Sequence, residues 1–211
     1  MSTASANFQS IEPAAIGLFK LLNDYGWHKM RAFVELTKTS REEFTNRRSD
    51  FESVDTAREV IAGSILQLAY FAIKRHGVSS GKSKAALHFE SQMNRLISEL
   101  PKPRKKTFVL PDQFCVGREI GDLPIGMIIY AGRNQYNHFD DDRLDVVNAV
   151  VFDHLRQLFP NPPNGHSFAA EGAKRPLSYA VLSALDWIDG PQALGFEPFK
   201  KDLSSILQIE T

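Results

Sequence analysis

The segment that decides the fold is residues 54–76, VDTAREVIAGSILQLAYFAIKRH. Its apolar residues recur every three or four positions, which is the period of an α-helix with a wide buried face. They are Ile61, Ile65, Leu68, Ala69, Ala72 and Ile73. Thr56 and Glu59 have the spacing of a capping box, with Asp55 as a rival cap, so we expect the helix to start there. Gly77 is the expected end of the helix.

The same period extends over most of the chain, and strand signals are scarce. We expect one helix to open at Pro13, a second to follow a break at Gly26, and further helices over residues 82–100, 123–137, 141–159, 177–188 and 196–207. Two of these have predicted inward stripes, formed by Leu87, Met93, Leu96 and Ile97, and by Leu144, Val147, Val151, Leu155 and Leu158. The sequence therefore predicts an all-α protein.

The chain of 211 residues has the length of one domain with extensions. We expect a flexible tail over residues 1–12, an N-terminal helical extension over 13–50, a core of four helices over 51–160, and a C-terminal helical extension over 161–211 that packs on the core. Segment 44–53, FTNRRSDFES, is polar and is expected to form a short helix or a loop.

Composition excludes several classes of protein. The 25 basic and 25 acidic residues give zero net charge, whereas a protein that coats nucleic acid through charge alone is basic. Cys115 is the single cysteine, so an internal disulfide and a cysteine zinc site are excluded. The start MSTASANFQS lacks signal-peptide features, and no apolar run has a membrane-spanning length. We expect a cytoplasmic protein with no membrane segment, metal or cofactor.

Four features have both a functional and a structural interpretation. GVSSGKS, residues 77–83, is similar to a phosphate-binding loop, but it lacks a glycine at His76 and follows a helix, which favours a simple turn. The basic run Lys102, Arg104, Lys105 and Lys106 is a candidate RNA contact or a solvated loop. His154 is expected to be a hydrogen-bonded structural residue, with a helper role at a functional site as the alternative. The acidic run 140–142 is a candidate cation site or, more simply, the N-cap of the next helix.

The strongest functional candidate is RNQYNH, residues 133–138, which follows an apolar helix. Arginine binds phosphate through two hydrogen bonds, and histidine exchanges protons near neutral pH. Together they can cut RNA without a metal, with the ribose 2′-hydroxyl as nucleophile. Arg133 and His138 would point about 140° apart on a straight helix, so we expect a helix end between them or a second chain that completes the site.

At these residues the sequence resembles the HEPN superfamily, whose members are helical bundles with an Arg-x(4–6)-His motif between two core helices. The resemblance covers about residues 123–159 and implies a metal-independent endoribonuclease that works as a homodimer, with both motifs in one cleft. It implies RNA as substrate and, for a toxin, a cognate antitoxin protein. Some such toxins carry Arg-x4-His-x-Tyr with a modified tyrosine. Asp140 stands at that position here, which argues against that mode of control.

The resemblance assigns phosphate stabilisation to Arg133 and proton transfer to His138, while Asn134 positions the phosphate or orients the histidine. Secondary candidates are Tyr136, Asn137 and Asp140. The alternative is a non-catalytic helical dimer that binds a protein or a nucleotide, because other HEPN members lack nuclease activity. In that case Arg133 and His138 would hold the helix junction together.

Overall fold

The computed structural model describes residues 3–38, 40, 43–77, 82–99, 109–110, 112–141, 146–160, 168, 175–188 and 195–208. The all-α prediction is confirmed, since the regular secondary structure of these residues is helical apart from a two-stranded antiparallel sheet. The elements are α1 Thr3–Lys38, α2 Phe44–His76, α3 Lys84–Ser98, η1 Asp112–Phe114, β1 Glu119–Ile120, β2 Leu123–Pro124, α4 Ile125–Asn137, α5 Val146–Leu158, α6 Ser178–Ala184 and α7 Phe196–Ile206. Among these described helices, none combines the length and apolar character needed to cross a bilayer.

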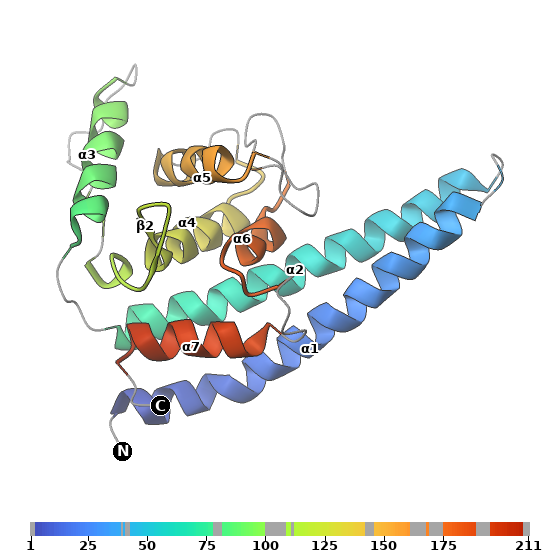
Figure 1. Cartoon of the computed structure of the whole chain (residues 1–211). Helices are drawn as coiled ribbons and strands as arrows, with labels where there is room; N and C mark the ends of the chain where they lie inside the picture. Colours follow the sequence, from blue (N-terminus) through green and yellow to red (C-terminus); the bar gives the residue numbers. More distant parts are fainter. Residues whose placement is uncertain are drawn as a thin grey trace.

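The two longest helices, α1 and α2, form an antiparallel hairpin (Figure 1). Its outer half projects beyond the other helices, whereas its inner half supports them. In the outer half, the ammonium of Lys29 pairs with Asp55, and the rings of Phe33 and Phe51 lie 6.4 Å apart. Helices α4 and α6 pack on α2, and α7 packs on both α1 and α2.

The predicted break at Gly26 and the predicted tail are both wrong. α1 begins at Thr3 and continues through Pro13 and Gly26 to Lys38, so residues 3–12 are helical. Phe8 and Phe19 are almost completely buried. A proline or a glycine inside a helix lowers the stability of that helix. Burial of these apolar side chains offsets this cost, because tertiary packing can override local helix propensity.

The predicted start of α2 is also wrong, because this helix already begins at Phe44 and includes the polar segment 44–53. Thr56 therefore lies inside the helix, where its hydroxyl donates to the carbonyl of Glu52. Glu59 does not cap its own helix but accepts a hydrogen bond from the backbone N–H of Tyr179 in α6. The predicted end at Gly77 is confirmed, and the glycine N–H donates to the carbonyl of Ile73.

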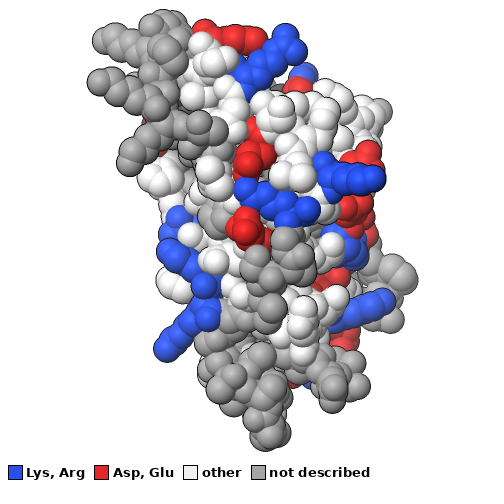
Figure 2. Space-filling view, turned by 90° about the vertical axis from the view of Figure 1, so that its left-hand side faces the viewer, with Lys and Arg blue, Asp and Glu red and all other residues white. Residues whose placement is uncertain are grey.

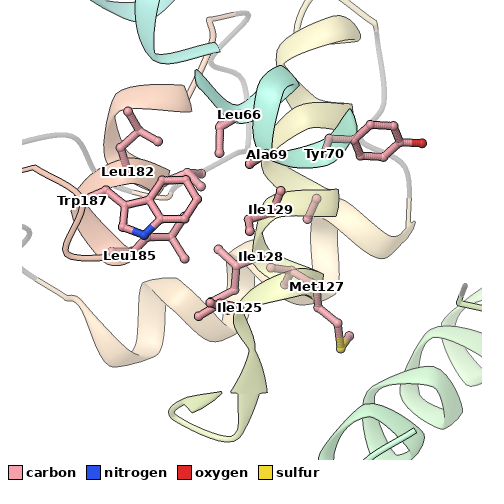
Figure 3. Packing of buried hydrophobic residues seen from close by; sticks show 14 of the residues in the cluster. Leu66, Ala69, Tyr70, Ile125, Met127, Ile128, Ile129, Leu182, Leu185 and Trp187 are labelled. Carbon is pink, nitrogen blue, oxygen red and sulfur yellow. The ribbon is translucent and has the colours of Figure 1, made fainter. Parts of the chain in front are cut away.

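The core lies where α2, α4 and α6 meet (Figure 3). Leu66 and Ala69 of α2 face the apolar side of α4, and Leu182, Leu185 and Trp187 close the other side. Gly132 lets Val181 and Leu66 approach α4 closely.

Two predicted inward positions are wrong. Leu87 is 52% exposed on α3 and Leu158 is 39% exposed at the end of α5, although Met93, Ile97, Val151 and Leu155 are buried as expected. Leu158 lies at the last residue of its helix and contacts Gly121 in the turn between β1 and β2, which covers only part of the side chain. Leu144 lies outside the described residues, as do the side chains of Leu96 and Val147.

The C-terminal helices belong to the same packed body. Asp202 of α7 is buried and accepts hydrogen bonds from the guanidinium of Arg118 at 2.9 and 3.0 Å and from the indole of Trp187 at 2.9 Å. Arg118 also donates to the carbonyl of Leu185. α6 packs directly on α2 and α4, and the expected domain boundary at residue 51 falls within α2.

Candidate functional site

The candidate site lies where α4 ends. The last helical residue is Asn137, and His138 leaves the helical conformation with a φ of −133°, while its N–H donates to the carbonyl of Gln135 at 3.2 Å. The carbonyl of His138 then accepts from the N–H of Asp141 at 3.2 Å, which closes a tight turn. The helix therefore ends between Arg133 and His138, which is one of the two arrangements expected from the sequence. The other, a second chain that completes the site, stays a prediction.

Arg133 is half-buried and directed toward α2. Its Nε donates to Oε1 of Gln67 at 3.1 Å, and its Nη1 donates to Oδ1 of Asn134 at 3.1 Å. The guanidinium carbon lies 4.6 Å from the centre of the Tyr70 ring, which is a cation–π distance. All these partners are uncharged, and the salt bridges in the described part of the chain do not include Arg133. Within the described residues, its positive charge is therefore held in place by neutral partners.

Asn137 completes this cluster from the last position of α4. Its Oδ1 accepts from Nε2 of Gln67 at 2.9 Å. With the amide turned so that the oxygen faces the guanidinium, that oxygen lies 3.0 Å from Nε of Arg133. One hydrogen-bonded group thus lies between α2 and the end of α4. We call it the arginine cluster, and it consists of Gln67, Arg133, Asn134 and Asn137.

His138 belongs to a different environment. Its side chain is 62% exposed, and Nδ1 lies 3.2 Å from Oδ2 of Asp141. A carboxylate at Nδ1 favours the tautomer with the proton on that nitrogen, which leaves Nε2 as an acceptor facing solvent. This is the orientation that a general base requires.

The structure does not join Arg133 and His138 through a shared partner among the described residues. Arg133 contacts α2, whereas His138 contacts the turn that follows α4. Two pockets are described elsewhere on the surface. One has a volume of about 410 Å³ beside Arg118, and the other has about 310 Å³ on α1. Neither pocket is lined by the arginine or the histidine.

Comparison with family models, with curated proteins and with solved structures finds no match.

The secondary candidates separate into different roles. The ring of Tyr136 packs on Gly63 of α2, where an added Cβ would overlap it. Tyr136 is thus a packing residue at the crossing of α2 and α4. Asn137 joins the arginine cluster, whereas Asp140 is exposed and the neighbouring Asp141 lies beside the imidazole of His138.

Sequence reasoning missed Gln67, Tyr70 and Asp141. Gln67 is a polar residue between Leu66 and Leu68 in an otherwise apolar stretch, which is a signal that a buried partner is needed. Asp141 lies three residues after His138, a spacing that brings side chains together in a turn. Nothing in the local sequence indicates that Tyr70 faces the guanidinium.

Two further polar side chains, Gln135 of α4 and Glu59 of α2, bind the chain around the start of α6. Gln135 is 2% exposed, donates to the carbonyl of Arg175 at 2.8 Å and accepts from the N–H of Leu177 at 2.9 Å. Glu59 accepts from the N–H of Tyr179 at 3.0 Å. Burial raises the pKa of Glu59 to about 7, against the opposing effect of its hydrogen bonds. Both residues fix the chain that leads into α6.

The remaining sequence candidates are resolved only in part. Lys102, Arg104, Lys105 and Lys106 lie outside the described residues, as does Asp142. On the face drawn in Figure 2, basic and acidic side chains alternate, and the described residues there form no broad patch of one sign. No three His, Cys, Asp or Glu side chains cluster as metal ligands in the described part of the chain.

Two structural interpretations agree with the contacts. Lys82, the lysine of GVSSGKS, is engaged with Glu90, and its ammonium also lies 3.6 Å from Asp112. The ion pair with Glu90 raises the pKa of Lys82 even though burial opposes it. His154 bonds through Nε2 to the carbonyl of Gly121 and packs edge-on against Phe89, so its predicted structural role is confirmed.

Proposed function

We propose that this protein is a metal-independent endoribonuclease of the HEPN type, with a HEPN-like core formed by α2, α3, α4 and α5. The observation that carries the proposal is the environment of Arg133, whose partners among the described residues are all neutral, together with the exposed His138–Asp141 pair in the turn that follows the same helix. A guanidinium without a carboxylate partner is available to an anion, and a phosphodiester is the anion that suits its fork of donors.

The proposed reaction uses the ribose 2′-hydroxyl as nucleophile. One histidine removes the proton of that hydroxyl, the 2′-oxygen attacks phosphorus, and the bond from phosphorus to the 5′-oxygen breaks. The leaving 5′-oxygen takes up a proton, which gives a 2′,3′-cyclic phosphate and a 5′-hydroxyl. Arg133 stabilises the charge that develops on the phosphorus oxygens.

The contacts assign supporting roles to neighbouring side chains. Asp141 orients His138, and Gln67 and Asn137 hold the guanidinium of Arg133 in one geometry. Asn134 bonds to the same guanidinium and so positions the phosphate through it. The helix geometry separates Arg133 from His138, so the proposal includes a homodimer in which the arginine of one copy works with the histidine of the other.

RNA is the proposed substrate, and Lys102, Arg104, Lys105 and Lys106 are proposed contacts to its phosphates. A cytoplasmic toxin or RNA-processing enzyme, with an antitoxin protein as partner in the first case, is the setting that this activity fits.

The decisive experiment is cleavage of total cellular RNA in excess EDTA. We expect products with 2′,3′-cyclic phosphate and 5′-hydroxyl ends, and resistance of RNA with a 2′-deoxy or 2′-methoxy sugar at the cut. His138→Ala should lower the rate by about 10² to 10⁴, the usual effect of losing a general acid or base. Arg133→Ala should cost a comparable factor through lost transition-state stabilisation.

Matched controls are His88→Ala and Arg95→Ala, which remove an exposed histidine and an exposed arginine from α3 and should retain full activity. Circular dichroism verifies that all four variants are folded. Cleavage that requires magnesium, persists without His138, or acts equally on DNA contradicts the mechanism.

One observation favours the alternative, a non-catalytic helical module that binds a protein or a nucleotide. The arginine cluster joins α4 to α2, as expected if Arg133 is a structural tie. Under this alternative, wild-type protein leaves RNA intact and Arg133→Ala lowers the melting temperature. Under the nuclease proposal, wild-type protein cuts RNA, and the same variant loses that activity while it remains folded.

A further inference from the structure

The outer face of α1 carries large apolar side chains that are exposed. Trp27 is 62% exposed, Met30 is 58% exposed and Val34 is 38% exposed. At about 100° per residue, Val34 lies roughly 20° and Met30 roughly 60° from the direction of Trp27, so the three form one stripe. An exposed stripe of this kind marks a contact surface more often than a stripe of charged residues does.

This stripe points away from the rest of the hairpin. Lys29, which pairs with Asp55 of α2, lies roughly 160° around α1 from Trp27. The side of α1 that packs on α2 is therefore opposite to the stripe. In Figure 1 the segment that carries the stripe belongs to the part of the hairpin that projects from the body.

The charged residues beside the stripe have an ordered pattern. Four exposed charged residues of α1 follow one another at spacings of four, seven and four positions: Lys20, Asp24, Arg31 and Glu35. They lie about 20–80° to one side of Trp27. Their signs alternate, and the pattern is centred between Trp27 and His28.

This pattern is complementary to itself in one orientation. When two copies of a helix pack antiparallel about a two-fold axis, residues at equal distances on opposite sides of the centre face each other. With the axis between Trp27 and His28, Asp24 faces Arg31 of the second copy and Lys20 faces Glu35. Every pair has opposite signs and occurs twice, so four ion pairs flank the apolar stripe and fix its register.

The surface at this centre is hollowed. A pocket of about 310 Å³ is lined by Asp24, Trp27, His28 and Arg31, the residues nearest the expected axis. In the antiparallel arrangement, the indole of the second copy's Trp27 enters this region.

We propose that the outer face of α1 binds the same face of a second copy of this chain, antiparallel, with Trp27 at the two-fold axis. This contact is separate from the proposed active site, because α2 lies between α1 and α4 and keeps Arg133 away from the axis. The inference therefore does not rest on the proposed nuclease activity.

Sedimentation equilibrium on charge-reversal variants tests the proposal. Asp24→Arg places an arginine against Arg31 of the other copy, and Arg31→Asp places an aspartate against Asp24 of the other copy, in each case at both symmetric positions. We expect each single variant to raise the dissociation constant by about tenfold, and the double variant to return to within about threefold of wild type. Trp27→Ala should raise the constant by at least about tenfold, as expected for a central aromatic anchor.

Asp50→Arg and Arg47→Asp are the matched controls. They make the same charge changes at exposed positions of α2 in the outer half of the hairpin and should leave association unchanged. Circular dichroism confirms that each variant is helical. A wild-type chain that stays monomeric up to hundreds of micromolar overturns the proposal. A dissociation constant that does not change in the Asp24 and Arg31 variants also overturns the proposal. So does a double variant that associates as weakly as the single variants.

Discussion

At the scale of single residues, the arginines of this protein differ in what holds them. Arg118 is paired with the buried carboxylate of Asp202, and Arg58 lies 3.6 Å from Asp55. Both charges are compensated within the fold, so these two arginines have a structural role. Arg133 is held by amide oxygens and an aromatic ring, and no carboxylate of the described residues pairs with it. This contrast makes Arg133 the better candidate for an anion.

Glu59 is the residue whose ionisation has the clearest effect on stability. Its pKa is raised to about 7 by burial, above the ordinary value of 4.5. The folded chain thus retains the proton between these two values while the unfolded chain releases it. Stability falls as pH rises through this window, and the full cost, up to about 3 kcal/mol, is present above pH 7.

We expect Glu59→Gln to remove this cost, because glutamine can still accept from the N–H of Tyr179 but never ionises. The variant should match wild type in urea unfolding near pH 4.5 and exceed it by up to about 3 kcal/mol at pH 8. The control Glu52→Gln, at an exposed position of the same helix, should differ from wild type by less than about 0.5 kcal/mol at either pH. A difference between Glu59→Gln and wild type that is the same at both pH values contradicts the burial account.

At the scale of helices, the sequence predicts those elements whose periodicity and boundaries agree. α4 and α7 are apolar on one face and bounded by turns, so their positions are close to the prediction. The start of α2 was not predictable in this way, because segment 44–53 is polar. It is helical next to α1, where Phe51 contacts both Phe33 and Lys29. The same limit applies to the site: the end of α4 follows from local sequence, whereas the contact of Arg133 with Gln67 joins residues far apart in the chain.

Glycines inside the helices test this distinction between local and tertiary effects. Gly26 in α1 has open space where a Cβ would be, so Gly26→Ala should stabilise the fold by about 1 kcal/mol through helix propensity. Gly63 in α2 faces the ring of Tyr136, so Gly63→Ala should cost a net 1–2 kcal/mol, roughly the overpacking penalty less the propensity gain.

Thermal unfolding of both variants measures these effects. In a Tyr136→Ala background, Gly63→Ala should become stabilising, because the ring that it overlaps is gone. If Gly63→Ala destabilises both backgrounds equally, the close contact between the two helices is not the cause.

At the scale of the whole molecule, the two proposed contacts use opposite sides of the hairpin. The outer face of α1 provides one surface, and the turn after α4 provides the other, where Phe139 is 36% exposed beside His138. Two different two-fold contacts on one chain generate assemblies larger than a dimer, closed or open according to the angle between the axes. The nuclease proposal requires only the contact at the motif.

We therefore expect light scattering to resolve the two contacts. Wild-type protein at high micromolar concentration should have at least twice the mass of a dimer. Asp24→Arg, which breaks the α1 contact, should leave a dimer that still cuts RNA. Phe139→Asp places a charge in the contact beside the motif and should leave a dimer that no longer cuts RNA, while both changes together should give a monomer. A composite site needs the arginine of one copy near the histidine of the other. A Phe139→Asp protein that retains wild-type mass and activity therefore contradicts a two-fold axis at the motif, and this conclusion does not depend on the α1 contact.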